Sequence, residues 1–301
     1  MGLTGAPSAE DIARAAEWLR AGKLVAIPTE TVYGLGANAL DEDAVKRIFA
    51  AKGRPASSPL IVHVSDLAMA RELAALWPPQ ADALAERFWP GPLTIIVSKS
   101  DKVPDVVTAG LPSVALRMPL HPVALAVIAA AGIPVAAPSA NRFTQLSPTT
   151  AQHVRDGLGD AVDFVLDGGA CAVGIESTVI SLVGPVPRIL RPGMVSQTQI
   201  EEVIGPVETG GGVESPGQHA KHYSPRTRVV IGEGPAFGRG VRVAMPSIPA
   251  VAAEVLYRNL HELDEQGYDW IAVELPPDTP EWAGVRDRII RAAHQDSSDP
   301  K

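Results

Sequence analysis

The sequence has a single cysteine among its 301 residues and no long apolar run. Cys171 cannot form a disulfide within the chain, which favours a reducing, cytoplasmic location. We expect it to fill a small apolar space rather than to act as a nucleophile. No run approaches the ~20 apolar residues that span a bilayer. The first residues also lack the basic segment and apolar core of a secretory signal. The sequence therefore predicts neither a membrane span nor a leader.

The common signatures of metal and nucleophile sites are absent as well. There is no His-x-x-His, no cysteine cluster and no His-Glu-x-x-His, so we expect no structural or catalytic zinc. There is no Gly-x-Ser-x-Gly elbow, and no residue stands out as a covalent nucleophile. Because a Gly-x-x-x-x-Gly-Lys-[Ser/Thr] loop is missing, any nucleotide must be held by another design.

Positive charge is scarce, since 26 Lys and Arg stand against 34 Asp and Glu, a net charge of −8. This balance argues against a nonspecific nucleic-acid coat but leaves room for a local basic cleft. The 46% of hydrophobic and 20% of charged residues are typical of a soluble globular protein. A chain of 301 residues is long for one core, so two domains are expected.

What the sequence does contain is centred on residues 24–36. Residues 24–27 form a short apolar run typical of a buried strand, and Pro28 ends it because proline cannot donate to the ladder. A strand that opens into a polar, glycine-containing loop is a common frame for a ligand site. The glycines let the backbone bend and approach the ligand; the alternative is a tight structural turn. The loop residues in question are Thr29, Glu30, Thr31, Tyr33, Gly34 and Gly36.

Hydrophobic periodicity predicts an α/β protein of the α+β type, with a mixed, twisted sheet and flanking helices. Ser8 and Asp11 cap the first predicted helix, Gly22 closes it, and Asp41 caps the second. Further helices are predicted from Ser65 to about 76, at 78–88 and 123–131, from near 148, and at 197–204. The predicted strands cover 24–27, 60–64, 93–97, 114–118, 134–137, 164–166, 178–183 and 188–190.

Glycine and proline concentrate in residues 205–226, where hydrophobic periodicity disappears, and this predicts a linker. We therefore expect a first domain at 1–204 and a small α/β, Rossmann-like domain at 227–301. The second domain is predicted to contain strands at 228–231, 241–245 and 269–275 and helices at 249–266 and 282–293.

Several polar residues stand where strands or helices end. Lys52 and Arg54 lie in a Gly/Pro/Ser-rich loop that suits a phosphate or carboxylate, although a solvated basic turn has the same composition. His63 lies in an apolar strand, where a histidine is more often a satisfied core residue than a ligand. Arg117 is costly in its apolar strand unless an anion pairs with it, either a structural carboxylate or a substrate. Other strand ends carry 138–141, 174–179 and Arg191. Their convergence on one sheet edge, with no nucleophile, suits phosphoryl or nucleotidyl transfer.

These stretches together resemble the Sua5/YrdC/YciO family, over about residues 8–204. The motifs that carry the resemblance, in family order, are Pro28-Thr-Glu-Thr-Val-Tyr-Gly-Leu-Gly, Lys52-Gly-Arg-Pro with Pro59-Leu-Ile-Val-His, Trp89-Pro-Gly-Pro-Leu-Thr, Leu116-Arg-Met-Pro, Ala137-Pro-Ser-Ala-Asn, Glu176-Ser-Thr-Val and Leu190-Arg-Pro-Gly. Residues 215–225 are similar to the linker of the longer Sua5 branch, which carries an additional C-terminal domain.

The resemblance implies a twisted-sheet domain and an L-threonylcarbamoyladenylate synthase. Such an enzyme joins L-threonine, bicarbonate and ATP, the last with Mg2+, into threonylcarbamoyl-AMP and pyrophosphate for the t6A modification of tRNA. Downstream transferase proteins would receive the product, and direct tRNA binding is not expected. Two alternatives stay open: a double-stranded RNA-binding module, and a carbamoyl-transfer enzyme of the hydrogenase-maturation type. Enzymes of the second type normally carry zinc-finger segments, which a chain with a single cysteine cannot form.

Position by position, the resemblance also implies a site. Lys52 and Arg54 are the expected catalytic cations, and His63 is the candidate general base. The residues expected to hold threonine are Thr31, His63, Arg117, Ser177 and Ala137. Those expected to hold ATP or bicarbonate are Lys52, Arg54, Ser58, Ser113, Ser139, Asn141, Ser147, Arg191 and Tyr223. Ser58 departs from the family's usual Asn, and the C-terminal module is shorter than the branch leads us to expect. His219, Lys221, His222 and Tyr223 lie in one short run, which predicts that the linker is a lid over the nucleotide; the alternative is a docked tether.

Overall fold

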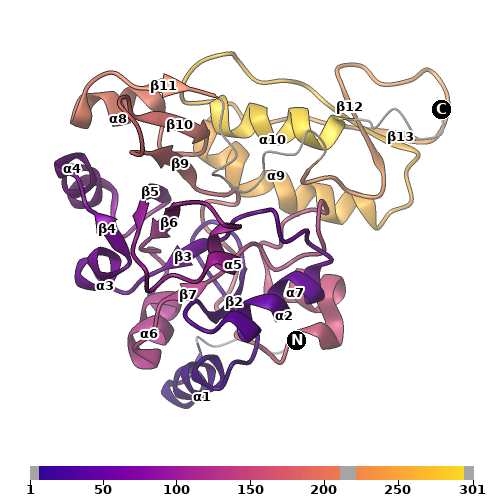
Figure 1. Cartoon of the computed structure of the whole chain (residues 1–301). Coiled ribbons are helices and arrows are strands. Elements are labelled where there is room, and N and C mark those ends of the chain that lie inside the picture. The colour runs from indigo at the N-terminus through magenta and orange to yellow at the C-terminus, as the bar shows by residue number, and fades with distance from the viewer. Residues whose placement is uncertain (1–6, 211–221, 295–301) are drawn as a thin grey trace.

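The computed structural model describes residues 7–210 and 222–294, which form two sheets surrounded by helices (Figure 1). The larger, mixed sheet has the strand order β11-β10-β9-β5-β6-β3-β7-β2-β1-β8, with β4 paired to β5. Its strands are β1 (Val25–Ile27), β2 (Gly34–Asn38), β3 (Ile61–His63), β4 (Ala74–Leu76), β5 (Leu93–Lys99), β6 (Ser113–Arg117), β7 (Val135–Ala136), β8 (Phe164–Val165), β9 (Thr178–Ser181), β10 (Arg188–Arg191) and β11 (Glu208–Thr209). This confirms the expected mixed sheet.

The helices follow local sequence signals. Ser8 and Asp11 form a capping box at α1 (Ala9–Arg20), and the Asp41 carboxylate accepts two backbone N–H bonds at the start of α2 (Glu42–Lys52). The remaining helices around the larger sheet are α3 (Leu67–Glu72), α4 (Pro79–Phe88), α5 (Asp105–Thr108), α6 (Pro122–Ala131), α7 (Ala151–Leu158), the short 3-10 helix η1 (Gly159–Ala161) and α8 (Gln197–Ile204).

The expectation for the stretch after Pro28 was partly wrong, because Gly34 and Gly36 lie inside strand β2 rather than in the loop. A Cβ added at Gly36 would lie 2.9 Å from Cγ1 of Val135 and 3.1 Å from the carbonyl oxygen of Val25. The glycines therefore let β2 pack closely between β1 and β7. The polar loop is confined to residues 28–33.

Other predicted boundaries were wrong because a different side chain caps the helix or because tertiary pairing prevails. Asp66, not Ser65, caps α3, accepting a bond of 2.8 Å from the backbone N–H of Met69. Residues 74–76, expected as helix, instead pair with β5. Thr150 caps α7, which begins after the position expected near 148. Two elements were not predicted from the sequence: helix α5, and strand β11, which lies within the expected linker.

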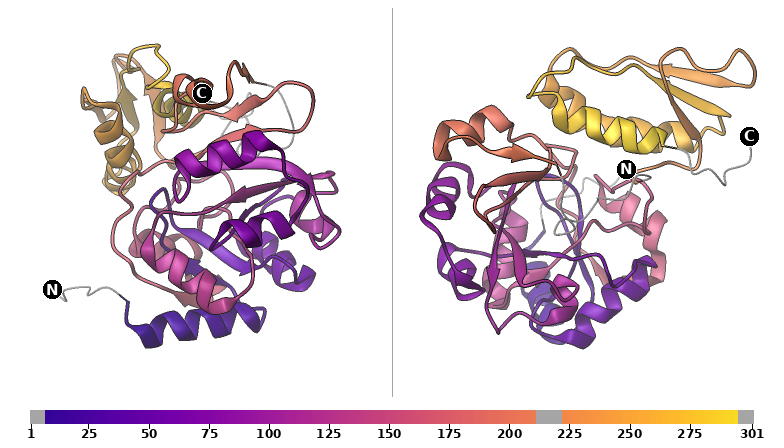
Figure 2. Two further views of the ribbon diagram at one scale, coloured as in Figure 1. Left: turned by 90° about the vertical axis from the view of Figure 1, so that its left-hand side faces the viewer. Right: turned by 45° about the horizontal axis from the view of Figure 1, so that its top comes forward.

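The C-terminal part is a parallel sheet of order β12-β14-β13 with two helices. Its elements are β12 (Arg228–Ile231), β13 (Gly240–Val243), α9 (Pro249–Asp264), β14 (Trp270–Val273) and α10 (Ala283–Ala293). Both helices face the first part of the chain (Figure 2). A shared apolar cluster joins Leu256 and Val285 of these helices to Val32 and Ile175, so the small unit packs directly on the polar loop.

Candidate functional site

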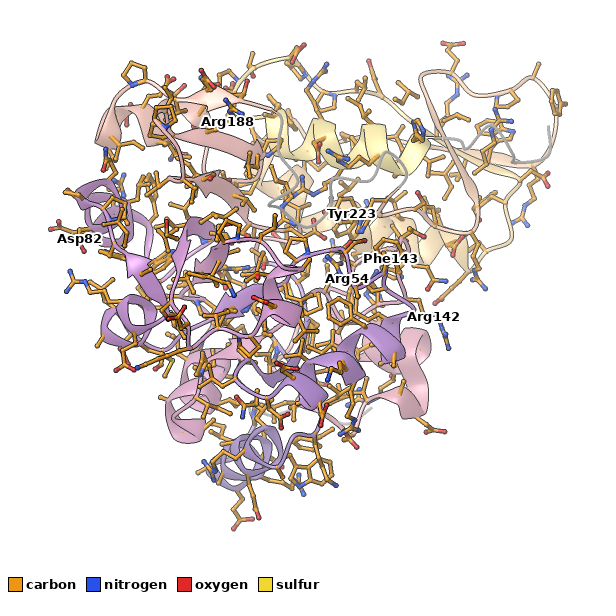
Figure 3. All side chains as sticks on the ribbon, in the orientation of Figure 1. Arg54, Asp82, Arg142, Phe143, Arg188 and Tyr223 are labelled. Carbon is orange, nitrogen blue, oxygen red and sulfur yellow. The ribbon has the colours of Figure 1, made fainter. Side chains whose placement is uncertain are left out.

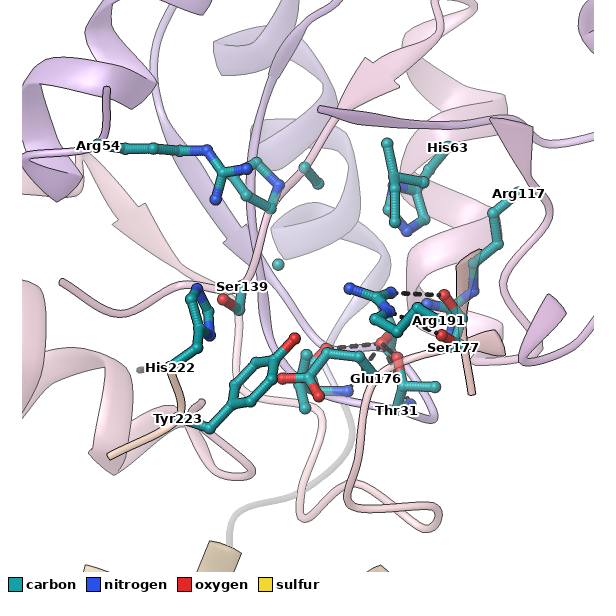
Figure 4. A pocket seen from close by; sticks show the side chains of 16 residues that line it. Thr31, Arg54, His63, Arg117, Ser139, Glu176, Ser177, Arg191, His222 and Tyr223 are labelled. Atoms are coloured by element: carbon teal, nitrogen blue, oxygen red, sulfur yellow. Dashed lines mark hydrogen bonds between the residues drawn. The ribbon is translucent and has the colours of Figure 1, made fainter. Parts of the chain in front are cut away.

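The ends of β3, β6, β7 and β10, the loop 28–33 and the turn before β9 surround one cavity of about 50 Å³ (Figure 4). His63 and Arg117 are partners in the parallel pairing of β3 with β6, so the strands place both side chains at the same edge. The expected convergence of strand ends is therefore present. Predicted site residues that line the cavity are Thr31, Arg54, His63, Arg117, Ala137, Ser139, Ser177, Arg191 and Tyr223.

Lys52 does not line this cavity, and it is the last residue of α2 rather than a loop residue as expected. Its ammonium group donates to the backbone carbonyls of Ser139 and Asn141, each at 2.5 Å. Burial lowers the pKa of Lys52 well below its usual value, and the charge of Arg54 adds to the effect. In this arrangement Lys52 holds the turn 139–141 in place; its direct role on a phosphate stays a prediction.

Four other predicted ATP residues, Ser58, Ser113, Asn141 and Ser147, also lie outside the lining of the small cavity. Asn141 lines a neighbouring cavity of about 290 Å³ between α7, α9 and residues 224–226. Its Nδ2 donates to the carbonyl of Arg142 at 2.8 Å. Ser147 donates from Oγ to Glu176 Oε1 at 2.5 Å, so it acts within the wall of the site rather than on its surface.

Several buried polar atoms of the predicted site residues have no hydrogen-bond partner. In residues 7–210 and 222–294, the buried side-chain nitrogen and oxygen atoms without a hydrogen-bond partner are Arg54 Nε, His63 Nδ1, Ser113 Oγ, Asn141 Oδ1 and His222 Nδ1. Each such atom costs about 1–3 kcal/mol, so native structures contain few of them. Four of the five belong to residues already predicted to bind ATP or threonine. Three of the five, on Arg54, His63 and His222, belong to residues that line the cavity, which favours a site that is completed by a polar ligand.

Arg117 has a structural partner, which resolves one of the alternatives left open by the sequence. Its Nη2 donates to Glu30 Oε1 at 2.7 Å, and its Nε donates to the carbonyl of Gly91 at 3.3 Å. The second oxygen of Glu30 accepts from the backbone N–H of Leu120 at 3.0 Å. The guanidinium is thus fixed by its Nε and Nη2 while the residue still lines the cavity.

Ser177 connects two sides of the cavity. Its Oγ lies 2.8 Å from Thr94 Oγ1 and accepts from Arg191 Nη2 at 3.1 Å, while Arg191 Nε donates to the Ser177 carbonyl at 3.1 Å. Across the cavity, Thr29 Oγ1 donates to the Val32 carbonyl at 2.6 Å and holds the polar loop. The hydroxyls of Ser177 and Thr29 and the guanidinium of Arg191 therefore line the same cavity. Such a set of groups suits the polar groups and the negative charge of a small zwitterion.

His63 lines the cavity, which disagrees with the reading of a satisfied core histidine. Burial, helped by the charge of Arg117, lowers the pKa of His63 to about 3. The ring is therefore neutral at pH 7 and a weak proton acceptor in the free protein. This state suits recognition of a hydroxyl or amine better than general-base catalysis.

Sequence reasoning did not assign Glu176 or His222 to the site, yet both line the cavity. Glu176 lay inside the quoted Glu-Ser-Thr-Val motif, and His222 lay in the linker run, so each had a usable signal. His222 and Tyr223 have ring centroids 4.1 Å apart, and both side chains are buried. His219 and Lys221 lie outside the described residues.

The buried histidines predict acid sensitivity. Burial lowers the pKa of both His63 and His222 to about 3, whereas the unfolded chain titrates near the usual 6.5. Below pH 6.5 the unfolded state therefore binds more protons, and stability is lost as the pH falls toward 3. We expect each histidine to remove ~2 kcal/mol of unfolding free energy at pH 5, from ~1.4 kcal/mol per pH unit. Urea unfolding at pH 7.5 and pH 5 measures the difference, and His63→Gln should reduce it. An unchanged difference in that variant would contradict the assignment.

Comparisons with known proteins identify two matching families and several relatives. The Sua5/YciO/YrdC family, described as "Telomere recombination", matches residues 17–193, and the family described as "Threonylcarbamoyl-AMP synthase, C-terminal domain" matches residues 195–294. A threonylcarbamoyl-AMP synthase of Pyrococcus abyssi is 50% identical over 73% of this chain and 67% of its own length. One of Bacillus subtilis is 41% identical over 94% of this chain and 92% of its own.

Solved structures of related proteins have a similar fold. The P. abyssi Sua5 crystal structure with L-threonine has a TM-score of 0.91 and 39% identity, covering 96% of both chains. A full-length HypF structure has a TM-score of 0.54 at 23% identity, covering 62% of this chain and 29% of its own, which is a similarity of fold alone.

Two features are absent from residues 7–210 and 222–294. No helix within them is both long and apolar enough to cross a membrane. Within the same ranges, no group of three or more His, Cys, Asp or Glu side chains is placed to hold a metal ion.

Proposed function

The chain belongs to the Sua5/YciO/YrdC family, and on that premise we propose that it is a threonylcarbamoyl-AMP synthase. It would join L-threonine, bicarbonate or CO2, and ATP into threonylcarbamoyl-AMP and pyrophosphate. The observation that carries the proposal is a cavity lined by hydroxyls and arginines, in which Arg54, His63 and His222 each have a buried polar atom without a partner in the described residues.

The reaction has two bond-forming steps. The threonine amine attacks CO2 or bicarbonate and gives a carbamate, with loss of a proton in the first case and of water in the second. A carbamate oxygen then attacks the α-phosphorus of ATP, and the bond to pyrophosphate breaks. This transfer of an adenylyl group makes the enzyme a nucleotidyltransferase. Positioning and neutralisation of charge supply most of the catalysis in such transfers.

The residues divide into two sides. On the threonine side, Arg117 binds the carboxylate, while Thr31, His63 and Ser177 contact the amine and hydroxyl and Ala137 contacts the methyl group. On the nucleotide side, Arg54 and Arg191 neutralise the phosphates. Burial lowers the pKa of Arg54 to about 10, so its guanidinium is charged at pH 7.

Magnesium enters as part of the nucleotide. Among the described residues, the one carboxylate that lines the cavity, Glu176, already accepts bonds from Ser147 and Arg288. Residues 7–210 and 222–294 therefore offer no carboxylate cage, and the ion would be held mainly by phosphate oxygens. Transfer of the product to downstream t6A proteins and a cytoplasmic location complete the proposal.

Incubation with ATP, L-threonine and bicarbonate tests this function directly. We expect pyrophosphate release that depends on both threonine and bicarbonate, and threonylcarbamoyl-AMP in the mass spectrum. Pyrophosphate release that is independent of threonine, or none at all, would overturn the proposal.

Selectivity among amino acids tests the threonine side. Serine loses the methyl contact and should have a kcat/KM lower by ~1 kcal/mol of transition-state binding. Valine lacks the hydroxyl, leaves buried polar partners unpaired and should lose a further ~1–3 kcal/mol. Pyrophosphate release with each amino acid gives the ratios. Equal binding of valine and threonine by calorimetry would contradict this pocket assignment.

The lid prediction rests on His222 and Tyr223. A cavity of about 50 Å³ is far smaller than the roughly 300–1,000 Å³ of usual ligand pockets. We therefore infer that the wall formed by His222 and Tyr223 moves when ATP binds. If Tyr223 then covers the nucleotide, the double change His222→Ala with Tyr223→Ala should weaken ATP binding by ~1–3 kcal/mol, the worth of one aromatic stack. Calorimetry with ATP measures this loss. Full ATP affinity and synthesis rate in the variant would mean that the segment is only a tether.

A further inference from the structure

A buried arginine of the C-terminal unit reaches the wall of the cavity. Arg288, on α10, has no exposed side-chain surface. Its Nε donates to Glu176 Oε2 at 2.7 Å and its Nη2 to the Glu176 carbonyl at 3.2 Å. Its Nη1 donates to the carbonyl of Pro192 at 2.9 Å, next to Arg191. One guanidinium therefore holds two segments that carry cavity residues.

The Glu176 carboxylate is fully engaged by these contacts. Oε1 accepts from Ser147, and Oε2 accepts from Arg288 and from Tyr257 OH at 3.0 Å. Two of the three donors thus come from the C-terminal unit. Figure 4 shows this carboxylate beside Tyr223, and Arg191 lines the same cavity.

The backbones of the C-terminal unit and of the first part of the chain also approach each other closely. A Cβ added at Gly284 of α10 would lie 2.8 Å from the carbonyl carbon of Gly193, and one added at Gly174 would lie 2.4 Å from the carbonyl oxygen of Ala253 on α9. These contacts flank Glu176 and Arg191 in the sequence. The C-terminal helices are therefore built against the two segments that supply the anion-binding side.

We propose that Arg288 is a positioning residue for the nucleotide: it neutralises Glu176, so that this carboxylate does not repel a triphosphate bound by Arg191 and Arg54. The inference rests on the proposed function and extends it, because it makes the C-terminal unit part of the synthase site. Without Arg288, the buried carboxylate would draw on the neighbouring cations and repel the phosphates. Threonine, held across the cavity by Arg117, would be little affected.

The test compares four variants with the wild type: Arg288→Met, Glu176→Gln, the double variant, and Arg286→Met. Arg286 is a matched control because it lies on the same helix but pairs with Asp278 and the carbonyl of Pro276. Calorimetry gives the Kd for ATP and for threonine, and steady-state assays separate KM from kcat. We expect Arg288→Met to weaken ATP binding by roughly tenfold or more, with threonine affinity within about twofold. The control should match the wild type. The double variant should recover most of the ATP affinity, because Glu176 is then neutral and Asp287, the other carboxylate that pairs with Arg288, keeps its ion pair with Arg291.

Three results would overturn the inference. They are an unchanged ATP affinity in Arg288→Met, a parallel loss of ATP and threonine affinity, or no recovery in the double variant. If Arg288→Met fails to fold, the double variant decides, because it removes both charges and should fold and bind ATP within a few-fold of Glu176→Gln. A wild type that binds ATP but releases no pyrophosphate defeats the proposed function alone, since the ATP affinities still test Arg288.

Discussion

Replacement of Arg54 by alanine should abolish most synthase activity, with a loss of ~2–4 kcal/mol of transition-state stabilisation, the usual effect of removing one charge-stabilising group. Arg54 lines the cavity, its Nη2 donates to the carbonyl of Pro59 at 3.1 Å, and its Nε has no partner within the described chain. The guanidinium is thus anchored at one nitrogen and left incomplete at another, as a ligand-binding cation should be. Pyrophosphate release under saturating threonine and bicarbonate measures the loss.

Arg54 lies in a loop, where an arginine side chain ordinarily makes few packing contacts, but in this structure it is packed. Arg54 is 7% exposed and its guanidinium carbon lies 5.7 Å from the ring centroid of Phe143. Thermal unfolding must therefore accompany the assay. Arg142→Ala is the matched control, because Arg142 is exposed and points away from the site (Figure 3). A folded Arg54→Ala protein that turns over like the Arg142→Ala control would remove Arg54 from the site.

The parts of the site that could be predicted share one property: each lies where a regular element ends. Apolar runs of four or five residues located the strands, and the polar residues that follow them had to meet at one edge. His63 and Arg117 illustrate this, since neighbouring parallel strands carry both. Strand β2 was not predicted, because its sequence, Gly-Leu-Gly-Ala-Asn, has poor strand propensity. It forms a strand through its pairing with β1 and β7.

The interactions within the wall could not be predicted, because their partners are far apart in the chain. Glu176 and Arg288 are 112 positions apart, and Glu30 and Arg117 are 87 apart. Arg288 belongs to no motif, and an arginine on an amphipathic helix ordinarily reads as solvent-exposed. Its burial depends on the packing of two units, which no local pattern encodes. Removing the whole C-terminal unit would also remove Arg288 from Glu176, so point substitutions in the linker test the lid more cleanly than a truncation would.

Replacement of Glu30 by alanine should destabilise the protein strongly, by ~3–5 kcal/mol, because it leaves the Arg117 charge buried without its partner. Both side chains are almost fully buried, at 5% and 4% exposure, and their oxygen and nitrogen are 2.7 Å apart. Glu30→Gln should cost less, since its one amide oxygen still accepts from either the guanidinium or the Leu120 N–H, while the amide NH2 faces the other donor. Urea unfolding at pH 7.5 gives the differences in unfolding free energy.

An exposed ion pair supplies the control for this last prediction. Arg188 and Glu208 are 2.5 Å apart, but their side chains are 45% and 51% exposed. Glu208→Ala should therefore change the unfolding free energy by only ~0–1 kcal/mol. The double change of Glu30 and Arg117 to methionine should recover most of the stability lost in Glu30→Ala, because no uncompensated charge remains, and yet should lose threonine binding. If Glu30→Ala proves no more harmful than Glu208→Ala, the pair does not fix Arg117. The guanidinium would then need the substrate carboxylate itself as its anion.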